Sequence, residues 1–382
     1  MPPSTSIATR ARTLSQTPLR HQHRHLHQHR NRPARTLLLT FDAFETLFYP
    51  CPPVPDQYAA IGHSFGLSKA LVTPSRLKAA FKHAFQTQTA RYPNYGRADV
   101  LRGRYAGPRQ WWEEVIRRSF ATVLAEEVNG DSSSASTSTS TSRRGDLELP
   151  SGMIEKLLDR FMGDGGYRLY DDVLPFFAKM RDLRASDSSD VQSKTKLPFD
   201  RIVLGVISNS DDRVPEVLKS LGLRVGRTRA DVDRSSTALP GFEEQEDAEN
   251  QHQPWADSGL ADVLSDVDLD LVITSYEAGA EKPDRLIYDV AKRQARRFVQ
   301  HQDRGLESRS GVTGMEGEES DGWTCVHVGD DFKKDYAGAV DAGWKSYLLQ
   351  RDGDAEDSAT TIQSLMALYE KLDLNVCYKQ SI

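Results

Sequence analysis

The chain has few cysteines and no long apolar run. Its 382 residues include three cysteines, at Cys51, Cys325 and Cys377, and no two of them have a paired spacing. This pattern excludes a disulfide framework or a zinc site built on paired cysteines, and it indicates a reducing, intracellular compartment. Because no apolar stretch approaches the roughly 20 residues that a membrane span needs, we expect no membrane association.

Acidic residues are absent from the first 41 positions, which hold seven arginines. The rest of the chain carries 42 of the 49 basic residues and all 55 acidic ones, a net charge of -13. An acidic body argues against nucleic acid as a partner. Residues 1–35 are rich in Arg, Ser, Thr and His and are typical of a mitochondrial transit peptide; the alternative is a disordered tail with no address, in a cytoplasmic or nuclear protein.

Apolar residues are also scarce for a compact enzyme, at 38% with a mean hydropathy of -0.56. Polar insertions account for the deficit. In Ser132–Ser142 ten of eleven residues are Ser or Thr, and three further polar stretches occur near 184–198, 224–262 and 301–322. We predict that these segments are loops between elements, since they have little apolar surface to bury.

Two apolar patterns remain between the insertions. Apolar residues at helical spacing predict four helices that follow a first buried strand at 37–41: 54–65, 74–89, 108–127 and 153–162. From Tyr167 onward short apolar runs alternate with helical patterns. The predicted strands are 202–207, 269–274, 324–328 and 345–349, and the predicted helices are 171–183, 212–221, 284–300 and 333–342.

This alternation predicts an α/β fold with a doubly wound parallel sheet, a Rossmann-like core with an inserted helical cap. The corresponding division assigns residues 1–35 to the tail, 36–50 and 167–382 to the core, and 51–166 to the cap. The cap contains YPNYG (Tyr92–Gly96), a turn signal, and the pair Trp111 and Trp112, which we interpret as packing between helices.

Polar side chains follow each of four predicted strands. The first strand ends at Asp42 and the second at Ser208 and Asn209; Lys282 follows the third, and the fourth precedes an acidic cluster of Asp330, Asp331 and Asp335. Taken singly, each has a structural explanation as a cap or a solvated charge. Carboxyl ends of parallel strands face one crevice, however, so we expect these groups to meet.

Such a crevice suits phosphoryl transfer to a carboxylate, with a lysine and a hard cation neutralising the developing charge. Ser208 and the amide of Asn209 would hold phosphate oxygens. Oxygen ligands from Asp42 and Asp330 suit Mg²⁺.

The segments FDAFETLF, VISNS, EKPD and HVGDDFKKD occur in the order of the haloacid dehalogenase (HAD) superfamily, and the chain resembles its members over residues 37–50 and about 167–350. The PNYG turn and the double Trp resemble a eukaryotic sub-branch of HAD-like hydrolase-domain-containing proteins. The resemblance implies that Asp42 is the nucleophile, Ser208 and Thr46 bind the transferred group, and Lys282 anchors it. It further implies Mg²⁺ on Asp42, Asp330 and the Phe44 carbonyl, with Asp331 and Asp335 in support.

The first motif departs from the phosphatase pattern Asp-x-Asp-Gly-Thr, because Phe44 replaces the second Asp and Glu45 replaces the Gly. Loss of this general acid–base implies a rate deficit of about 10²–10⁴-fold. Glu45 points elsewhere and is strained if its position needs a glycine backbone. We predict a Mg²⁺-dependent phosphatase of small phosphorylated compounds that works through an aspartyl-phosphate. A 2-haloacid dehalogenase and a catalytically degenerate binding protein remain as alternatives, and the sequence identifies no protein partner.

The N-terminal tail yields a first testable prediction. Residues 1–35 have no apolar periodicity, so their removal leaves the melting temperature unchanged. Thermal unfolding of the full and truncated chains, followed by circular dichroism, checks this, and a large drop on truncation contradicts it.

Overall fold

The computed structural model describes residues 35–130, 148–186, 197–226, 267–310, 322–352 and 360–374. The tail up to residue 34, the Ser/Thr-rich segment Ser132–Ser142 and most of the three polar insertions lie outside the described residues. Among the described helices, none combines the length and the apolar character that a bilayer span requires.

A six-stranded sheet forms the core, and all five of its pairings are parallel. Its strand order is β5-β4-β1-β6-β7-β8. The strands are β1 (Thr36–Phe41), β4 (Arg201–Ser208), β5 (Leu271–Thr274), β6 (Trp323–Gly329), β7 (Lys345–Leu349) and β8 (Thr361–Ile362). The order reverses at the central strand β1, and this is where open α/β sheets place their ligand crevice. The predicted fold class is confirmed.

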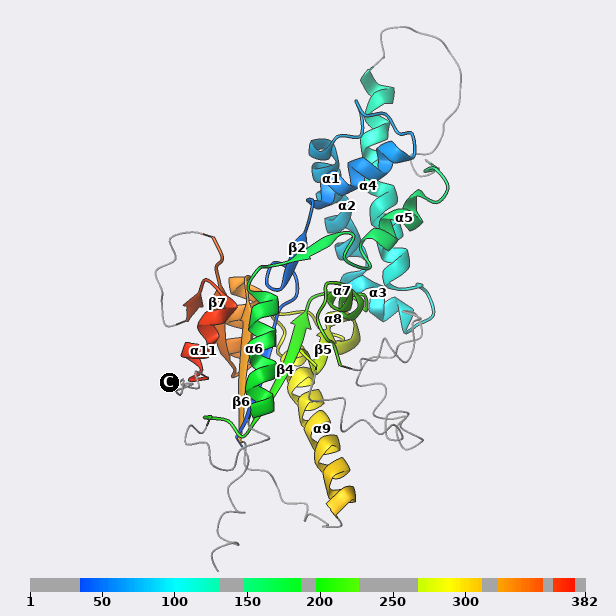
Figure 1. Ribbon diagram of the computed structural model, residues 1–382. Coiled ribbons are helices and arrows are strands. Elements are labelled where there is room, and N and C mark those ends of the chain that lie inside the picture. The colour runs from blue at the N-terminus through cyan, green and yellow to red at the C-terminus, as the bar shows by residue number, and fades with distance from the viewer. Residues whose placement is uncertain are drawn as a thin grey trace, which may run out of the picture.

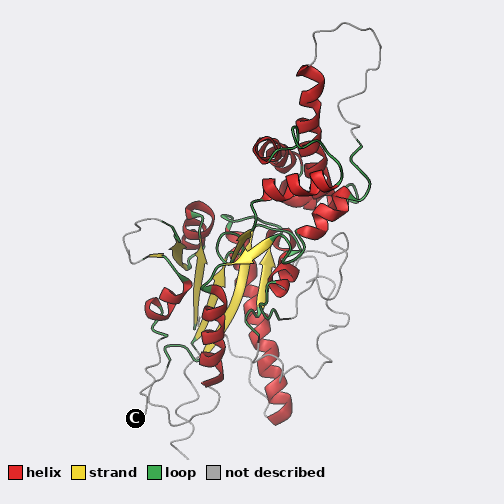
Figure 2. Ribbon diagram, turned by 45° about the horizontal axis from the view of Figure 1, so that its top comes forward, coloured by secondary structure: helices red, strands yellow, loops and turns green. Residues whose placement is uncertain are grey.

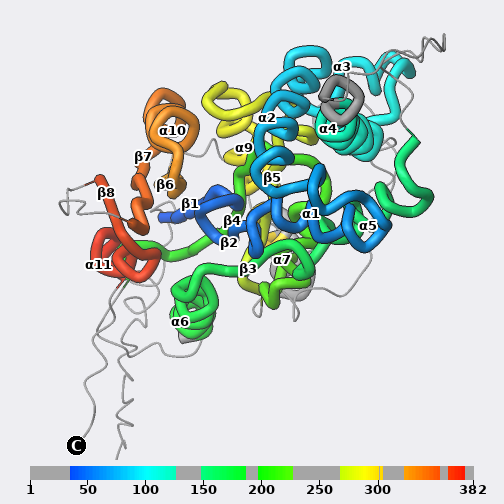
Figure 3. Tube along the Cα trace, turned by 90° about the horizontal axis from the view of Figure 1, so that it is seen from above, coloured from blue at the N-terminus to red at the C-terminus, as the bar shows by residue number. Residues whose placement is uncertain are grey.

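Helices cover both faces of the sheet, as Figures 2 and 3 show. Leu37, Leu39 and Phe41 of β1 pack with α6 (Val173–Ser186) and α11 (Leu368–Lys371) on one face. Leu38 packs with α9 (Arg285–Ser310) on the other. Since both faces of β1 are buried, its sequence is an apolar run rather than an alternation. The remaining core elements are α7 (Val214–Ser220), α8 (Ser275–Ala278), the π-helix η4 (Phe332–Ala337), α10 (Gly338–Asp341) and the 3-10 helix η5 (Leu365–Ala367).

An inserted helical region, which we call the cap, stands above the carboxyl ends of the strands (Figures 1 and 2). It comprises α1 (Val54–Ser64), α2 (Pro74–Arg91), α3 (Pro93–Val100), α4 (Pro108–Gly130) and α5 (Met153–Arg160). The chain enters and leaves it through an antiparallel ribbon of β2 (Phe48–Pro50) and β3 (Tyr167–Leu169). The buried Gln57 side chain donates to the carbonyls of Pro52 and Gly166 (2.9 Å to the latter), so α1 holds both connections together.

The structure differs from the sequence prediction in three respects. The helix predicted to end at Gln300 continues to Ser310, so the third insertion begins later than expected. The ribbon β2–β3 and the strand β8 were not predicted, because two or three residues carry no readable periodicity. Arg35, assigned to the tail, donates its backbone N–H to Asp200 Oδ2 (2.9 Å) and its guanidinium to the Leu197 carbonyl (3.3 Å). A truncation that ends at residue 34 keeps these contacts.

The packing of α6 against β1 provides a prediction for stability. Phe176 is fully buried, with ring centroids 5.5 Å from Phe41 and 5.4 Å from Tyr369. Phe176→Ala lowers the free energy of unfolding by about 3–5 kcal/mol, because the cavity it leaves cannot collapse completely. Leu174 on the same helix is 46% exposed, so Leu174→Ala changes the free energy of unfolding by less than about 0.5 kcal/mol. Urea titrations of the wild-type chain and of both variants measure these changes. Equal effects would contradict this assignment of core and surface.

Candidate active site

Asp42 lies directly beyond the carboxyl end of β1. Its backbone N–H donates to the Val328 carbonyl at 2.8 Å, which keeps the residue beside β6 where the two strands end. The side chain is mostly buried, and burial raises the pKa of the carboxyl while the neighbouring Lys282 opposes that rise. A buried, partnered carboxylate at this point of the sheet fits a nucleophile better than a solvated cap.

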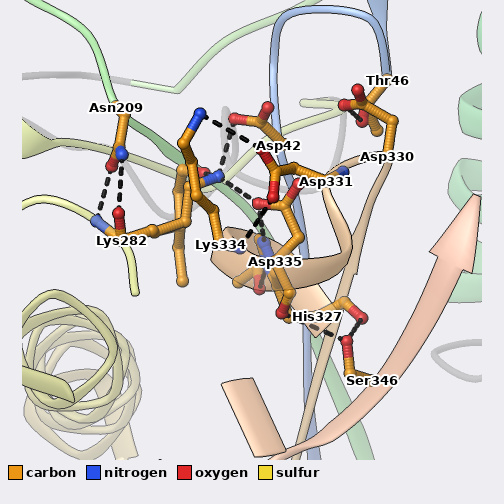
Figure 4. Close-up of polar contacts among 12 residues, drawn as sticks. Asp42, Thr46, Asn209, Lys282, His327, Asp330, Asp331, Lys334, Asp335 and Ser346 are labelled. Atoms are coloured by element: carbon orange, nitrogen blue, oxygen red, sulfur yellow. Dashed lines mark hydrogen bonds and ion pairs between the residues drawn. The ribbon is translucent and has the colours of Figure 1, made fainter. Parts of the chain in front are cut away.

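Lys282 reaches Asp42 from the connection between α8 and α9, as Figure 4 shows. Its buried ammonium lies 2.8 Å from Asp42 Oδ1 and forms an ion pair with it. The same Nζ donates to Asp335 Oδ1 at 2.6 Å and to the Ile207 carbonyl at 2.7 Å. Burial alone would lower the pKa of Lys282, but the two carboxylates outweigh it and raise that pKa, so the lysine stays charged.

Asp335 is held from below by groups inside the core. His327 Nε2 lies 3.3 Å from Asp335 Oδ1, and His327 Nδ1 lies 2.9 Å from Thr40 Oγ1 in the adjacent strand β1. Burial lowers the pKa of His327, which favours the neutral ring. Although burial disfavours a charged carboxylate, Lys282 and His327 together hold the pKa of Asp335 well below its usual range. Gly329 permits this arrangement, because a Cβ there would collide with the Asp335 carboxylate.

The two remaining acidic residues of the fourth motif have different surroundings. Asp331 Oδ1 accepts the backbone N–H groups of Lys333 and Lys334, both at 2.9 Å, and so caps η4. Asp330 instead accepts the Thr46 hydroxyl at 3.1 Å. Asp330 is exposed, but partial desolvation of its carboxyl and the charge of Asp335 raise the pKa of that carboxyl. Of this pair, Asp330 is therefore the carboxylate that lies with Asp42 and Asp335.

One carboxylate oxygen from each of Asp42, Asp330 and Asp335 lies within 4.8 Å of the other two. Lys282 supplies one positive charge against these three carboxylates, and His327 next to them is neutral. This leaves a negative centre with the oxygen donors that a hard divalent cation prefers.

Ser208 and Asn209 lie at the end of β4, and their surroundings differ in part from the sequence prediction. Ser208 is buried at the last position of the strand and pairs with Thr274, the N-cap of the short helix α8, whereas α7 begins only at Val214. The Asn209 side chain is fully engaged with Lys282: its Nδ2 donates to the Lys282 carbonyl (2.9 Å), and its Oδ1 accepts the Lys282 N–H (2.6 Å). The backbone N–H of Asn209 donates to no backbone carbonyl of the described residues.

Phe44 and Glu45 form a short loop over the site. The Phe44 ring packs edge-on against Phe48 (4.7 Å between centroids) and Tyr167 (5.7 Å). Its carbonyl accepts no hydrogen bond from a described residue. Glu45 has a φ of 56°, which confirms the backbone constraint expected at this position, and its carboxylate accepts the Tyr170 hydroxyl at 2.9 Å. Glu45 is therefore occupied away from the place of the missing acid.

Sequence reasoning missed two residues of this network. His327 was hidden in a strand that looked wholly structural; the signal was its register with Thr40, a polar residue in the otherwise apolar run of β1. Arg351 follows β7, donates to the Thr46 carbonyl at 2.7 Å and to Asp172 Oδ1 at 2.8 Å, and covers the Tyr170 ring at 3.9 Å. Its role depends on contacts more than 170 positions away, and no local pattern indicates it.

Comparison with known proteins places this geometry in context. No family model matches the chain. An uncharacterized protein of Saccharomyces cerevisiae is 27% identical over 352 residues, which is 92% of this chain and 84% of that protein. The human haloacid dehalogenase-like hydrolase domain-containing protein 3 is 23% identical and covers 82% of this chain and 81% of its own.

Among solved structures, a 2-haloacid dehalogenase from Pseudomonas syringae aligns over 89% of this chain and 99% of its own, with 16% identity and a TM-score of 0.41. The relatives align along most of the chain. The four motifs stand in order at the ends of parallel strands, and the structure brings their charged residues to one point. On these grounds the chain belongs to the haloacid dehalogenase-like hydrolase superfamily.

Proposed function

We propose that the protein is a Mg²⁺-dependent phosphatase of small phosphorylated compounds, with Asp42 as the nucleophile. The observation that carries this proposal is the ion pair of Asp42 with the buried Lys282, at the point where Asp330 and Asp335 also converge. A carboxylate that is to attack phosphorus must be ionised, and the adjacent ammonium favours that state.

The charge balance supports a divalent cation at this site. Three carboxylates and one lysine carry a net charge of about -2, and a phosphate monoester dianion would be repelled from them. Asp42, Asp330 and the unengaged Phe44 carbonyl are the oxygen donors that would hold Mg²⁺, whereas both oxygens of Asp335 are used by Lys282 and by the Asp331 N–H. The bound cation would offset the negative charge that phosphoryl oxygens bring into the site.

The chain's own residues would have the following roles in the reaction. An Asp42 oxygen forms a bond to phosphorus while the bond from phosphorus to the leaving oxygen breaks, and the leaving group takes that electron pair. Lys282, the Ser208 hydroxyl and the Asn209 amide would bind the transferred phosphoryl oxygens. Water attacks the aspartyl-phosphate, which releases phosphate and restores Asp42.

Phe44 limits the substrates on which this reaction can proceed. No carboxyl group at position 44 can protonate a departing alcohol, and Glu45 is bound to Tyr170. The protein should therefore act best on substrates whose leaving group departs without a proton, namely acyl phosphates and aryl phosphates of acidic phenols.

The second candidate is a 2-haloacid dehalogenase, which uses the same carboxylate against carbon and needs no metal. Phe44 favours it, because an aromatic residue at that position resembles the dehalogenases. The three converging carboxylates favour the phosphatase. A binding protein without turnover would keep the cation site and lose the chemistry.

The first test compares substrates with and without a chelator. We expect the purified protein to hydrolyse acetyl phosphate and 4-nitrophenyl phosphate in Mg²⁺, to lose that activity in excess EDTA, and to hydrolyse alkyl phosphates poorly. Asp42→Asn should reduce turnover by about 10⁴-fold or more, since an amide is not a nucleophile here. Released phosphate is the measurement. Halide release from a 2-haloacid that persists in EDTA would establish the dehalogenase instead, and no turnover of either kind would leave the binding protein.

A second test restores the missing acid. Phe44→Asp should raise hydrolysis of alkyl phosphates by about 10²-fold over Phe44→Asn. The Asn variant is the matched control, because it loses the same packing against Phe48 and Tyr167 but cannot exchange a proton. Steady-state rates on one alkyl phosphate give the comparison. Equal rates in two folded variants would show that position 44 does not face the leaving oxygen.

A further inference from the structure

The PNYG turn of the cap has an unusual backbone conformation. Asn94, Tyr95 and Gly96 adopt consecutive left-handed conformations, with φ of 46°, 59° and 76°. Two of the three are not glycine, although such residues rarely enter this region. Gly96 is additionally required by packing, because a Cβ there would lie 2.5 Å from the Tyr105 ring. Strain of this kind persists where the surrounding structure fixes it, and it often accompanies function.

The strained turn presents Asn94 to the core. Figure 1 shows α3, which contains the turn, beside α7 and α8. Asn94 Nδ2 donates to the Ser275 carbonyl at 2.7 Å, and Asn94 Oδ1 accepts the Ser275 hydroxyl at 3.0 Å. The same hydroxyl lies 3.2 Å from the Ser210 carbonyl, which also accepts the Tyr276 N–H at 3.2 Å. Asn94 is thereby tied to the loop that follows β4.

Two neighbours of Asn94 contact the same region. The Tyr95 hydroxyl donates to the Asn209 carbonyl at 3.5 Å, at the limit of a hydrogen bond. Arg97 lies against Gly279, where a Cβ would meet its guanidinium at 3.1 Å. The turn therefore touches both segments that approach Lys282, the loop after β4 and the connection after α8.

Asn209 completes the route to the reacting groups. Its side chain makes two hydrogen bonds to the backbone of Lys282, and Lys282 Nζ lies 2.8 Å from Asp42 Oδ1. The path from the cap to the nucleophile thus runs through Asn94, Ser275 with Ser210, Asn209 and Lys282. Every step in it is a direct contact or an adjacent residue.

We infer that Asn94 is a positioning residue, which sets the Asn209–Lys282 pair against Asp42 from the cap. This inference rests on the proposed function, because it concerns the anion that Lys282 would bind. The simpler reading is that Asn94 only docks the cap over the leaving group. The two readings differ for inorganic phosphate, which has no leaving group and would contact Lys282 but not the cap.

The test measures binding of inorganic phosphate to the full chain in Mg²⁺ by titration calorimetry. The variant is Asn94→Gly, since glycine keeps the left-handed backbone and removes only the side chain. We expect its phosphate affinity to fall about tenfold, as for weakening one hydrogen bond to a charged group. The matched control is Trp112→Phe, which removes a different contact from cap to core, the 2.7 Å bond from Trp112 Nε1 to Asp211 Oδ2. Arg213 still holds Asp211 in this control, so phosphate affinity should stay within about twofold.

Each outcome decides a different point. If the wild-type chain binds phosphate and Asn94→Gly binds it equally well, the inference is wrong while the proposed function stands. If the wild-type chain binds no phosphate, both are wrong. If Trp112→Phe loses as much phosphate affinity as Asn94→Gly, Asn94 only helps to dock the cap, and the inference is wrong. Should Asn94→Gly unfold, Ser275→Ala removes the hydroxyl that bridges Asn94 and Ser210, and unchanged phosphate affinity in that folded variant also overturns the inference.

Discussion

The buried ammonium of Lys282 is the interaction on which the site depends. Removing a lysine from water is costly, and here the cost is offset by Asp42, Asp335 and the Ile207 carbonyl. Asp42 follows β1, Ile207 lies near the end of β4, and Asp335 lies in η4, which follows β6. The lysine is therefore stabilised only when these strands stand in their native register. Loss of one partner would leave a buried charge unpaired, which typically costs about 3–5 kcal/mol.

The acidic residues around this lysine have separate tasks, although they are close in sequence. Asp331 caps η4, and Asp335 is divided between Lys282 and His327. Asp330 accepts the Thr46 hydroxyl, and its carboxyl has a raised pKa. This division leaves Asp42 to share the single charge of Lys282 with Asp335, while Asp330 has a hydroxyl as its neighbour. The proposed cation site therefore rests on how the hydrogen bonds are distributed, and not merely on the number of carboxylates.

The Phe44 side chain contributes packing and cannot transfer a proton. At the position where related phosphatases carry an acid, its ring joins Phe48 and Tyr167, and Tyr167 in turn contacts Phe161 at the end of α5. The loop over the site is thus packed into the ribbon that leads to the cap. The same ribbon, the Asn94 contacts and the bond from Trp112 to Asp211 connect cap and core at separate places, so a change in the cap can reach the reacting groups through packing or through hydrogen bonds.

The sequence by itself determined the parallel sheet, the helical insertion and the strand-end positions of Asp42, Ser208 and Asp330, because apolar periodicity and polar breaks are local properties of a chain. It placed Lys282 after the third strand and before a helix, and the structure inserts α8 between that strand and the lysine. The tertiary structure alone decided which neighbour each polar group has. It placed His327 beneath Asp335, turned the Asn209 side chain to Lys282, and separated Asp330 from the adjacent Asp331. Those outcomes depend on hydrogen bonds between residues far apart in sequence, and such pairings leave no periodic trace in the chain.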